Sequence, residues 1–331
     1  MSTGKNKLVV ADYINGIRSG DRTVLARGIT LVESALCEHR AMAETVLTEL
    51  LPEVKTSIRI GVTGVPGVGK STFIEAFGRY LTTSNHKVAV LAVDPTSTRT
   101  GGSILGDKTR MLELSRDTNA FIRPSPTSGT LGGVTRATRE TITLCEAAGF
   151  NVILVETVGV GQSEISVAGM VDFFLALMLP GAGDELQGIK KGLLEIADMI
   201  AVNKADGDMI TAARRAALEY EQALHILQPM SPNWIPSSLV CSALTGDGLP
   251  EIWKKIENFK KILETSGEWQ KKRQEQRINW MWSMIRERLM VSVEKNKEAQ
   301  ALAAELELDV KEQKITPGTA ALKVLAAANI R

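Results

Sequence analysis

The stretch Gly64-Val65-Pro66-Gly67-Val68-Gly69-Lys70-Ser71 has the form G-x-x-x-x-G-K-S. An apolar run of strand length, 58–63, precedes it, and residues 72–81 carry apolar side chains at helical spacing. A strand, a glycine-rich loop and a helix together provide backbone N–H groups and a helix N-terminus that surround phosphate. In such a loop Lys70 reaches the β- and γ-phosphates and the Ser71 hydroxyl ligates Mg²⁺. The pattern predicts a nucleoside triphosphate site.

The segment around this loop, 56–245, alternates strands and helices, which is typical of a doubly wound, mostly parallel sheet in an α/β fold. The further predicted strands are 87–93, 120–123, 152–156, 173–179, 199–203 and 238–241. Asp94, Glu156 and Asn203 each stand at the carboxyl end of a strand. Ligands bind at that edge of such sheets, so we expect these residues to converge on the phosphate loop.

Helical patterns flank the sheet on both sides. Residues 8–51 have apolar side chains every three or four positions, with a break at 19–21 and an end at Pro52. Residues 248–331 also read as helices, with two apolar stripes followed by two Ala-rich helices separated by a segment containing Pro317-Gly318. The stripes fit either dimerisation or docking on a partner, or folding back on the sheet. We predict an N-terminal helical segment (1–55), a nucleotide domain (56–265) and a C-terminal helical arm (266–331).

The apolar stripes are carried by Leu249, Ile252, Ile256, Phe259 and Leu263, and by Ile278, Met281, Trp282, Ile285 and Leu289.

The base of the nucleotide is indicated by Asn203-Lys204-Ala205-Asp206, an N-K-x-D at a strand end. The Asp206 carboxylate can accept two hydrogen bonds from guanine, and adenine has no matching pair of donors. Charge-assisted bonds of this kind contribute roughly 1.5–3 kcal/mol each, enough to select GTP over ATP. Downstream, Cys241-Ser242-Ala243-Leu244 has the form of a loop whose backbone N–H contacts guanine O6.

A carboxylate is needed near the γ-phosphate because Mg²⁺ prefers oxygen ligands. The matching strand end is Glu156-Thr157-Val158-Gly159, in which the Gly159 N–H can bond the γ-phosphate. Asp94 and Asp107 are further acidic candidates, although Asp94 could instead start a turn before proline and Asp107 could cap a helix.

The sequence does not identify the residue that activates the attacking water. Gln162 lies three residues beyond Gly159 and is not assigned this role. The segment 183–191 follows a strand and could form a mobile loop, from which Lys190 would contact the nucleotide or a partner; the alternative is a solvated turn. Two other long glycine-rich loops, 100–108 and 125–133, lie between strands and could also act on the ligand.

Composition narrows the class of protein. Of the 331 residues 44% are hydrophobic, and the formal net charge of +1 gives no support for a nucleic-acid or membrane partner. Three scattered cysteines without C-x-x-C spacing suit a reducing cytosol. We found no apolar run of membrane-spanning length and no signal-peptide core at the N-terminus. We therefore expect a cytoplasmic protein.

Together these motifs resemble the MeaB/ArgK family, the methylmalonyl-CoA-mutase-associated GTPases among the metallochaperone-type P-loop GTPases. The resemblance covers nearly the whole chain. Its most specific segments are 64–72, 94–111, 121–133, 145–163, 181–192 and 203–208.

The resemblance implies a homodimeric GTPase with slow hydrolysis. Such proteins bind an adenosylcobalamin-dependent acyl-CoA mutase, gate its cofactor loading and protect it from inactivation. It also implies switch loops at 94–107, 156–164 and 183–190, and a dimerisation arm at the C-terminus. The implied Mg²⁺ contacts are Ser71, Asp94, Asp107 and Glu156. The implied nucleotide contacts are Gly64–Thr72 and Gly159, with Asn203, Lys204, Asp206, Ser242, Ala243 and Leu244 at the guanine. Lys70, Asp94, Glu156 and Lys190 are the predicted catalytic set.

Rival interpretations differ in ligand or client. An ATP-dependent kinase or transport ATPase would leave the guanine-reading Asp206 without a partner. A nickel-delivery GTPase would need His or Cys clusters, which the sequence lacks. The D-x-H-x-x-G cobalamin motif is absent around the three histidines, so we expect no cobalamin site. The client could be methylmalonyl-CoA mutase or a relative such as 2-hydroxyisobutyryl-CoA mutase.

Overall fold

A computed structural model describes residues 8–51, 57–93, 111–124, 131–157, 162–180, 191–227 and 229–330, without the side chains of 131–133, 162, 163 and 191. Residues 1–273 form one compact unit and residues 274–331 a second. None of the helices in these ranges is long and apolar enough to span a bilayer.

Within the described residues, seven parallel strands form one sheet in the order β3-β2-β4-β1-β5-β6-β7. The strands are β1 (Ile58–Gly64), β2 (Val88–Val93), β3 (Ala120–Arg123), β4 (Val152–Thr157), β5 (Phe173–Met178), β6 (Met199–Val202) and β7 (Ser237–Val240). The predicted doubly wound sheet is therefore confirmed, and every strand matches its predicted range to within one or two residues. From β1 the chain first fills one side of the sheet with β2, β3 and β4 and then the other side with β5, β6 and β7. This change of direction places a topological switch point at the carboxyl end of β1.

Helices cover both faces of the sheet, which is why its strands are nearly continuous apolar runs. One face packs against α4 (Lys70–Thr83), α6 (Leu112–Arg116) and α11 (Leu249–Ser266). The other packs against α7 (Leu131–Ala147) and α8 (Gln162–Ala168), and, beside β5 and β6, against α9 (Lys191–Ile196) and α10 (Ile210–Ile226). Successive side chains of a strand alternate between these two cores.

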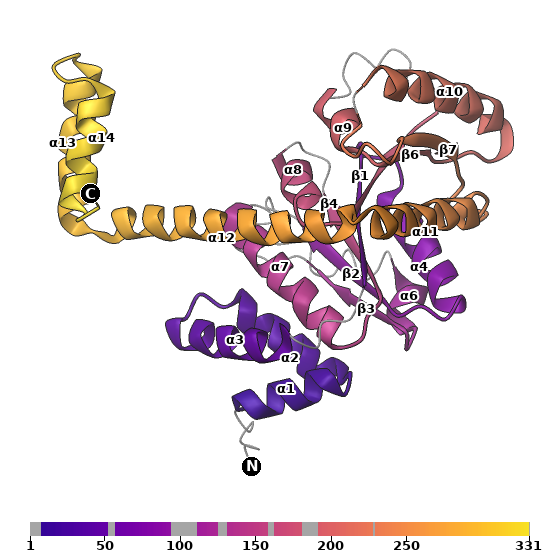
Figure 1. Ribbon diagram of the computed structural model, residues 1–331, viewed down its shortest axis with the longest axis horizontal. Coiled ribbons are helices and arrows are strands. Elements are labelled where there is room, and N and C mark those ends of the chain that lie inside the picture. The colour runs from indigo at the N-terminus through magenta and orange to yellow at the C-terminus, as the bar shows by residue number, and fades with distance from the viewer. Residues whose placement is uncertain are drawn as a thin grey trace. The chain divides into compact units, whose positions relative to one another are not determined.

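The N-terminal helices α1 (Val10–Arg18), α2 (Arg22–Glu33) and α3 (Cys37–Leu50) share a buried core with the α7 face of the sheet, and they lie beside α7 in Figure 1. The predicted break at 19–21 is confirmed, because α2 begins with Asp21 as its N-cap. The Asp21 carboxylate accepts from the N–H groups of Thr23 (2.7 Å) and Val24 (3.1 Å). Such a cap stabilises a helix by about 1 kcal/mol.

The first predicted C-terminal stripe is the buried face of α11, with Ile252 and Ile256 fully buried. α12 (Glu268–Lys295) follows, and the division between the two compact units falls inside it. The second stripe lies on α12 and stays exposed, with Ile278 at 54% and Trp282 at 51%.

The second unit ends in two paired helices, α13 (Lys297–Lys311) and α14 (Pro317–Ala327). Pro317-Gly318 was predicted to separate the Ala-rich helices, but Pro317 is the first residue of α14. Proline fits there because the first helical N–H has no partner within the helix. Thr316 is the N-cap, and its hydroxyl accepts from the Thr319 N–H at 3.3 Å.

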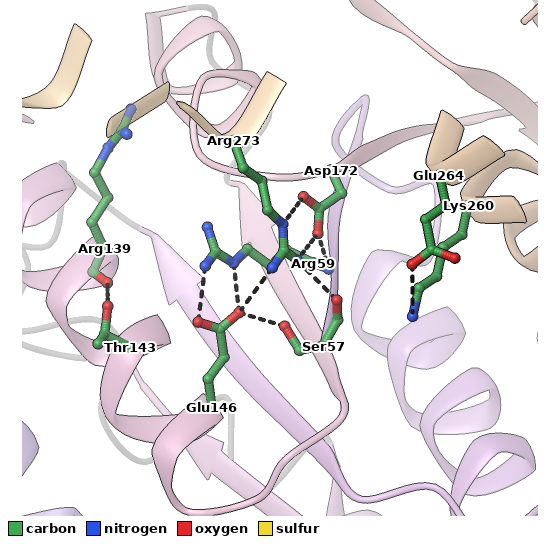
Figure 2. Close-up of polar contacts among 9 residues, drawn as sticks. All are labelled: Ser57, Arg59, Arg139, Thr143, Glu146, Asp172, Lys260, Glu264 and Arg273. Atoms are coloured by element: carbon green, nitrogen blue, oxygen red, sulfur yellow. Dashed lines mark hydrogen bonds and ion pairs between the residues drawn. The ribbon is translucent and has the colours of Figure 1, made fainter. Parts of the chain in front are cut away.

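A buried ion network lies at the amino ends of β1 and β5 (Figure 2). Arg273, at the start of α12, donates to Asp172 at 2.6 and 2.8 Å and to the Ser57 carbonyl oxygen at 2.8 Å. Arg59 of β1 forms a bidentate pair with Glu146 of α7 at 2.8 Å, and the Ser57 hydroxyl also donates to that carboxylate. These contacts fix the amino ends of the two strands to α7 and α12.

Burial by itself would raise the pKa of Asp172, but the hydrogen bonds and charge of Arg273 and the charge of Arg59 hold that pKa below its usual value. Ionised Asp172 therefore stabilises the fold at pH values above its pKa in the unfolded chain, which is about 3.9. This contribution is lost as the pH falls through the lower folded-state pKa.

We expect Arg273→Met to lower the free energy of unfolding by roughly 3–5 kcal/mol at pH 7, because it leaves Asp172 buried without its main cation. The difference from the wild type should shrink as the pH falls below about 4, where Asp172 becomes protonated in the variant and then in the wild type. Urea unfolding at both pH values measures this.

Glu264→Gln is the matched control, because its pair with Lys260 (3.9 Å) is partly exposed (Figure 2) and contributes at most about 1 kcal/mol. Equal stability of Arg273→Met and wild type at pH 7 would contradict the assigned role of the network.

Candidate nucleotide-binding site

The phosphate loop begins where β1 ends and closes onto the first turn of α4. Gly64 has φ +156°, and a Cβ there would lie 2.5 Å from the Leu177 carbonyl oxygen of the neighbouring strand. Gly69 has φ +89° and is the N-cap of α4. Both positions therefore require glycine, one for space and one for its left-handed backbone. The first N–H groups of α4, which have no partner within the helix, are available to an anion.

Lys70 lies over this loop, and its Nζ donates to the Gly64 carbonyl oxygen at 2.7 Å. Burial lowers the pKa of Lys70 below that of an ordinary lysine, while the charges of Glu156 and Glu164 offset part of this shift. Glu164, in α8, is only 8% exposed and was not among the predicted site residues. The signal that could have identified it is an acidic residue in the first turn of a helix that follows Gly159 and Gly161.

The predicted metal ligands Ser71 and Glu156 lie together. The Ser71 hydroxyl, at the start of α4, donates to Glu156 Oε1 at 3.3 Å, and Glu156 is the penultimate residue of β4. Two oxygen groups side by side at the carboxyl edge of the sheet suit a hard cation such as Mg²⁺. Next to them, the buried Thr157 hydroxyl donates to the Thr63 hydroxyl at 2.8 Å and joins the ends of β4 and β1.

Asn203, directly after β6, joins three segments of the site. Its Nδ2 donates to the Val68 carbonyl oxygen of the phosphate loop at 2.9 Å, and its Oδ1 accepts from the Ala243 N–H at 3.0 Å. The Cys241 thiol also donates to Oδ1 at 3.8 Å, and burial raises the pKa of that thiol to about 12. Asn203 is 1% exposed, so its amide is committed to these contacts.

The base-reading segments are also tied to each other. The Ser242 hydroxyl donates to Asp206 Oδ2 at 2.5 Å and accepts from the Leu244 N–H at 3.2 Å. Lys204 adopts a left-handed backbone with φ +61°, which few non-glycine residues do. Leu244 is 80% exposed and free to cover a planar base. Asp206 is therefore oriented before any base arrives.

Four predicted site residues, Asp94, Asp107, Gly159 and Lys190, lie outside the described residues, as does most of each predicted switch loop. The side chain of Gln162 is likewise not described. The other predicted residues, 64–72, 156, 203–206 and 242–244, meet at the carboxyl ends of β1, β4, β6 and β7.

We expect Asp206→Asn to lower GDP affinity by about 100-fold or more, because two charge-assisted hydrogen bonds from guanine lose their carboxylate. The same change should shift preference toward xanthine nucleotides, whose 2-oxo group accepts from the new amide. Competition of GDP and XDP for the site measures both effects. Asp208→Asn, an exposed change two residues on, is the matched control and should keep the guanine preference. An unchanged preference in Asp206→Asn would remove Asp206 from the site.

Comparison with known proteins gives a consistent result. The model of the family described as methylmalonyl-CoA mutase-associated GTPase MeaB matches residues 25–298. A probable GTPase of Mycobacterium tuberculosis is 53% identical, over 100% of this chain and 98% of its own length. A mouse protein named methylmalonic aciduria type A homolog, mitochondrial, is 46% identical, over 98% of this chain and 80% of its own. A solved structure described as a LAO/AO transport system kinase is 41% identical with a TM-score of 0.79, covering 96% of this chain and 98% of its own.

The family match covers most of the chain, and the relatives extend along almost all of it. The phosphate loop and the guanine-reading segments agree with the GTPase named in the family description. The chain therefore belongs to the MeaB family of methylmalonyl-CoA mutase-associated GTPases and is itself a GTPase.

Proposed function

We propose that this GTPase associates with an adenosylcobalamin-dependent acyl-CoA mutase, by default methylmalonyl-CoA mutase, gates loading of its cofactor and protects it from inactivation. The main support for GTP binding is the Asn203 side chain, which joins the phosphate loop to the base-reading segment. The family description and the name of the mouse relative support association with a mutase. A related client such as 2-hydroxyisobutyryl-CoA mutase would use the same nucleotide chemistry.

In the proposed hydrolysis, the oxygen of water forms a bond to the γ-phosphorus. The bond from that phosphorus to the β–γ bridging oxygen breaks, giving GDP and phosphate. Positioning and charge stabilisation supply most of the catalysis in such reactions. The loop N–H groups and Lys70 hold the β- and γ-phosphates, and the lowered pKa of Lys70 reflects how far its ammonium is withdrawn from water.

Ser71 and Glu156 would hold Mg²⁺, with Asp94 and Asp107 as the further proposed ligands. The ion would neutralise charge that develops on the phosphate oxygens. Gly159 is proposed to bond the γ-phosphate, and Lys190 to complete the catalytic set. The segments 94–107, 156–164 and 183–190 are proposed as the switches that report the nucleotide state to the mutase.

The C-terminal arm is proposed to form a homodimer. The exposed α12 stripe supports this, because exposed apolar side chains at helical spacing form a continuous surface that a second copy can bury. The side chains concerned are Ile278, Met281, Trp282, Ile285 and Leu289, which are 37–54% exposed.

GTP hydrolysis should rise when the cognate mutase is added to the wild-type protein. We would measure phosphate release with purified adenosylcobalamin-dependent acyl-CoA mutases from the same organism, added one at a time. Lys70→Ala should lose hydrolysis in every mixture while remaining folded, because the phosphates lose their cation.

A rise in GTP hydrolysis with one mutase would support the proposed association and identify that mutase as the partner. No rise with any mutase, despite tight GTP binding, would contradict the mutase assignment. Retained turnover in Lys70→Ala would contradict the assignment of the phosphate loop.

A further inference from the structure

Two buried threonine hydroxyls join the carboxyl ends of β1 and β4. Thr157 donates to Thr63 at 2.8 Å between their Oγ1 atoms, and the two residues are 1% and 0% exposed. In the described register of β1 against β4 the last backbone pair is Val62 with Glu156, so the threonines lie one position beyond it. The hydroxyl bond therefore continues the connection between the two strands past their last backbone pair.

The ends of the strands are held on both faces of the sheet. Side chains of β4 alternate, so that Leu154 packs in the core on the α4 side and Val155 in the core on the α8 side. By the same alternation Glu156 faces α4 and Thr157 faces α8. The bond from Thr157 to β1 thus lies on one face of β4, and the bond between Glu156 and Ser71, at 3.3 Å, lies on the other.

Each threonine is next to a residue that takes part in the nucleotide site. Thr63 precedes Gly64, whose carbonyl oxygen accepts from Lys70 Nζ at 2.7 Å. Thr157 follows Glu156, the partner of the Ser71 hydroxyl. The threonine bond therefore joins the start of the phosphate loop to the backbone that carries Glu156. Because both hydroxyls are withdrawn from water, solvent cannot replace the bond if one of them is removed.

We propose that Thr63 and Thr157 are positioning residues for Mg²⁺ in the nucleotide site: their hydrogen bond holds Glu156 beside the phosphate loop, where it and Ser71 bind the same ion. The inference rests on the proposed Mg²⁺-dependent hydrolysis and assigns a role to two residues that are not proposed as ligands. The two oxygen groups are then arranged before the ion arrives, so that binding does not have to order them.

Four variants test this role. Thr157→Val keeps the shape of the side chain but removes the donor, and it leaves the Thr63 hydroxyl buried without this partner. The double variant Thr63→Val/Thr157→Val removes both hydroxyls, whereas Thr157→Ser keeps the donor. Thr138→Val is the matched control, because Thr138 is also buried and its hydroxyl donates at 2.8 Å to the Val134 carbonyl oxygen within α7.

Calorimetry with a non-hydrolysable GTP analogue gives two quantities for each protein: its affinity in EDTA, and the Mg²⁺ concentration at which half of the Mg²⁺-dependent gain in affinity is reached. Urea unfolding gives the stability. Thr157→Val should raise the half-maximal Mg²⁺ concentration about 5-fold, the factor that corresponds to losing one buried neutral hydrogen bond. It should also be less stable than the wild type, because it leaves a buried hydroxyl without its partner.

The double variant separates positioning from general stability. It should regain most of the stability lost in Thr157→Val, since replacing both partners by apolar groups of the same shape is nearly neutral. Its half-maximal Mg²⁺ concentration should nevertheless stay raised. Thr157→Ser keeps the hydroxyl and should stay within about 2-fold of the wild type, as should the distant control Thr138→Val. Affinity for the analogue in EDTA should be equal in all five proteins.

An unaltered Mg²⁺ dependence in Thr157→Val would overturn the inference. So would a Mg²⁺ dependence that recovers together with stability in the double variant, or an equal loss of affinity in EDTA. If Thr157→Val does not fold, the double variant, which leaves neither hydroxyl unpaired, decides the question. A wild-type protein whose binding of the analogue and GTP hydrolysis do not respond to Mg²⁺ would contradict the proposed function itself, a result distinct from wild-type behaviour of the threonine variants.

Discussion

The nucleotide site depends on the side-chain amide of Asn203. One end of that amide holds the phosphate loop through the Val68 carbonyl oxygen, and the other holds the base-reading segment through the Ala243 N–H. Both contacts are buried, so neither backbone group can form a hydrogen bond with bulk water if the amide is removed. The phosphate loop and the base-reading segment are therefore joined directly by one side chain, and the Ser242 hydroxyl of that segment donates to Asp206. Recognition of phosphate and recognition of the base become properties of a single rigid site.

The sheet is fixed at the amino ends of two central strands, opposite the nucleotide site. Arg59 and Asp172 stand at the amino ends of β1 and β5, and Arg273 and Glu146 tie them to α12 and α7 (Figure 2). The carboxyl end of β1 leads into the phosphate loop. Fixing the amino end of β1 therefore also fixes the position at which this loop begins.

Local patterns in the sequence predicted the sheet, the phosphate loop and the guanine-reading segments, because buried parallel strands and anion-binding loops have local signatures. Pairings between distant positions were not predictable. Asp172 and Arg273 are 101 residues apart and Arg59 and Glu146 are 87 apart, and no pattern in one member indicates the other. The α12 stripe was visible in the sequence, and its side chains are exposed within the described residues.

The most direct measurement is calorimetric titration of the wild type and of Asn203→Ala with GDP and with ADP. If one amide joins phosphate and base recognition, the wild type should bind GDP at least about 100-fold more tightly than ADP. Asn203→Ala should then lose both affinity for GDP and most of the discrimination between the two nucleotides. Equal binding of GDP and ADP by the wild type, or full GDP affinity and discrimination in Asn203→Ala, would contradict this account.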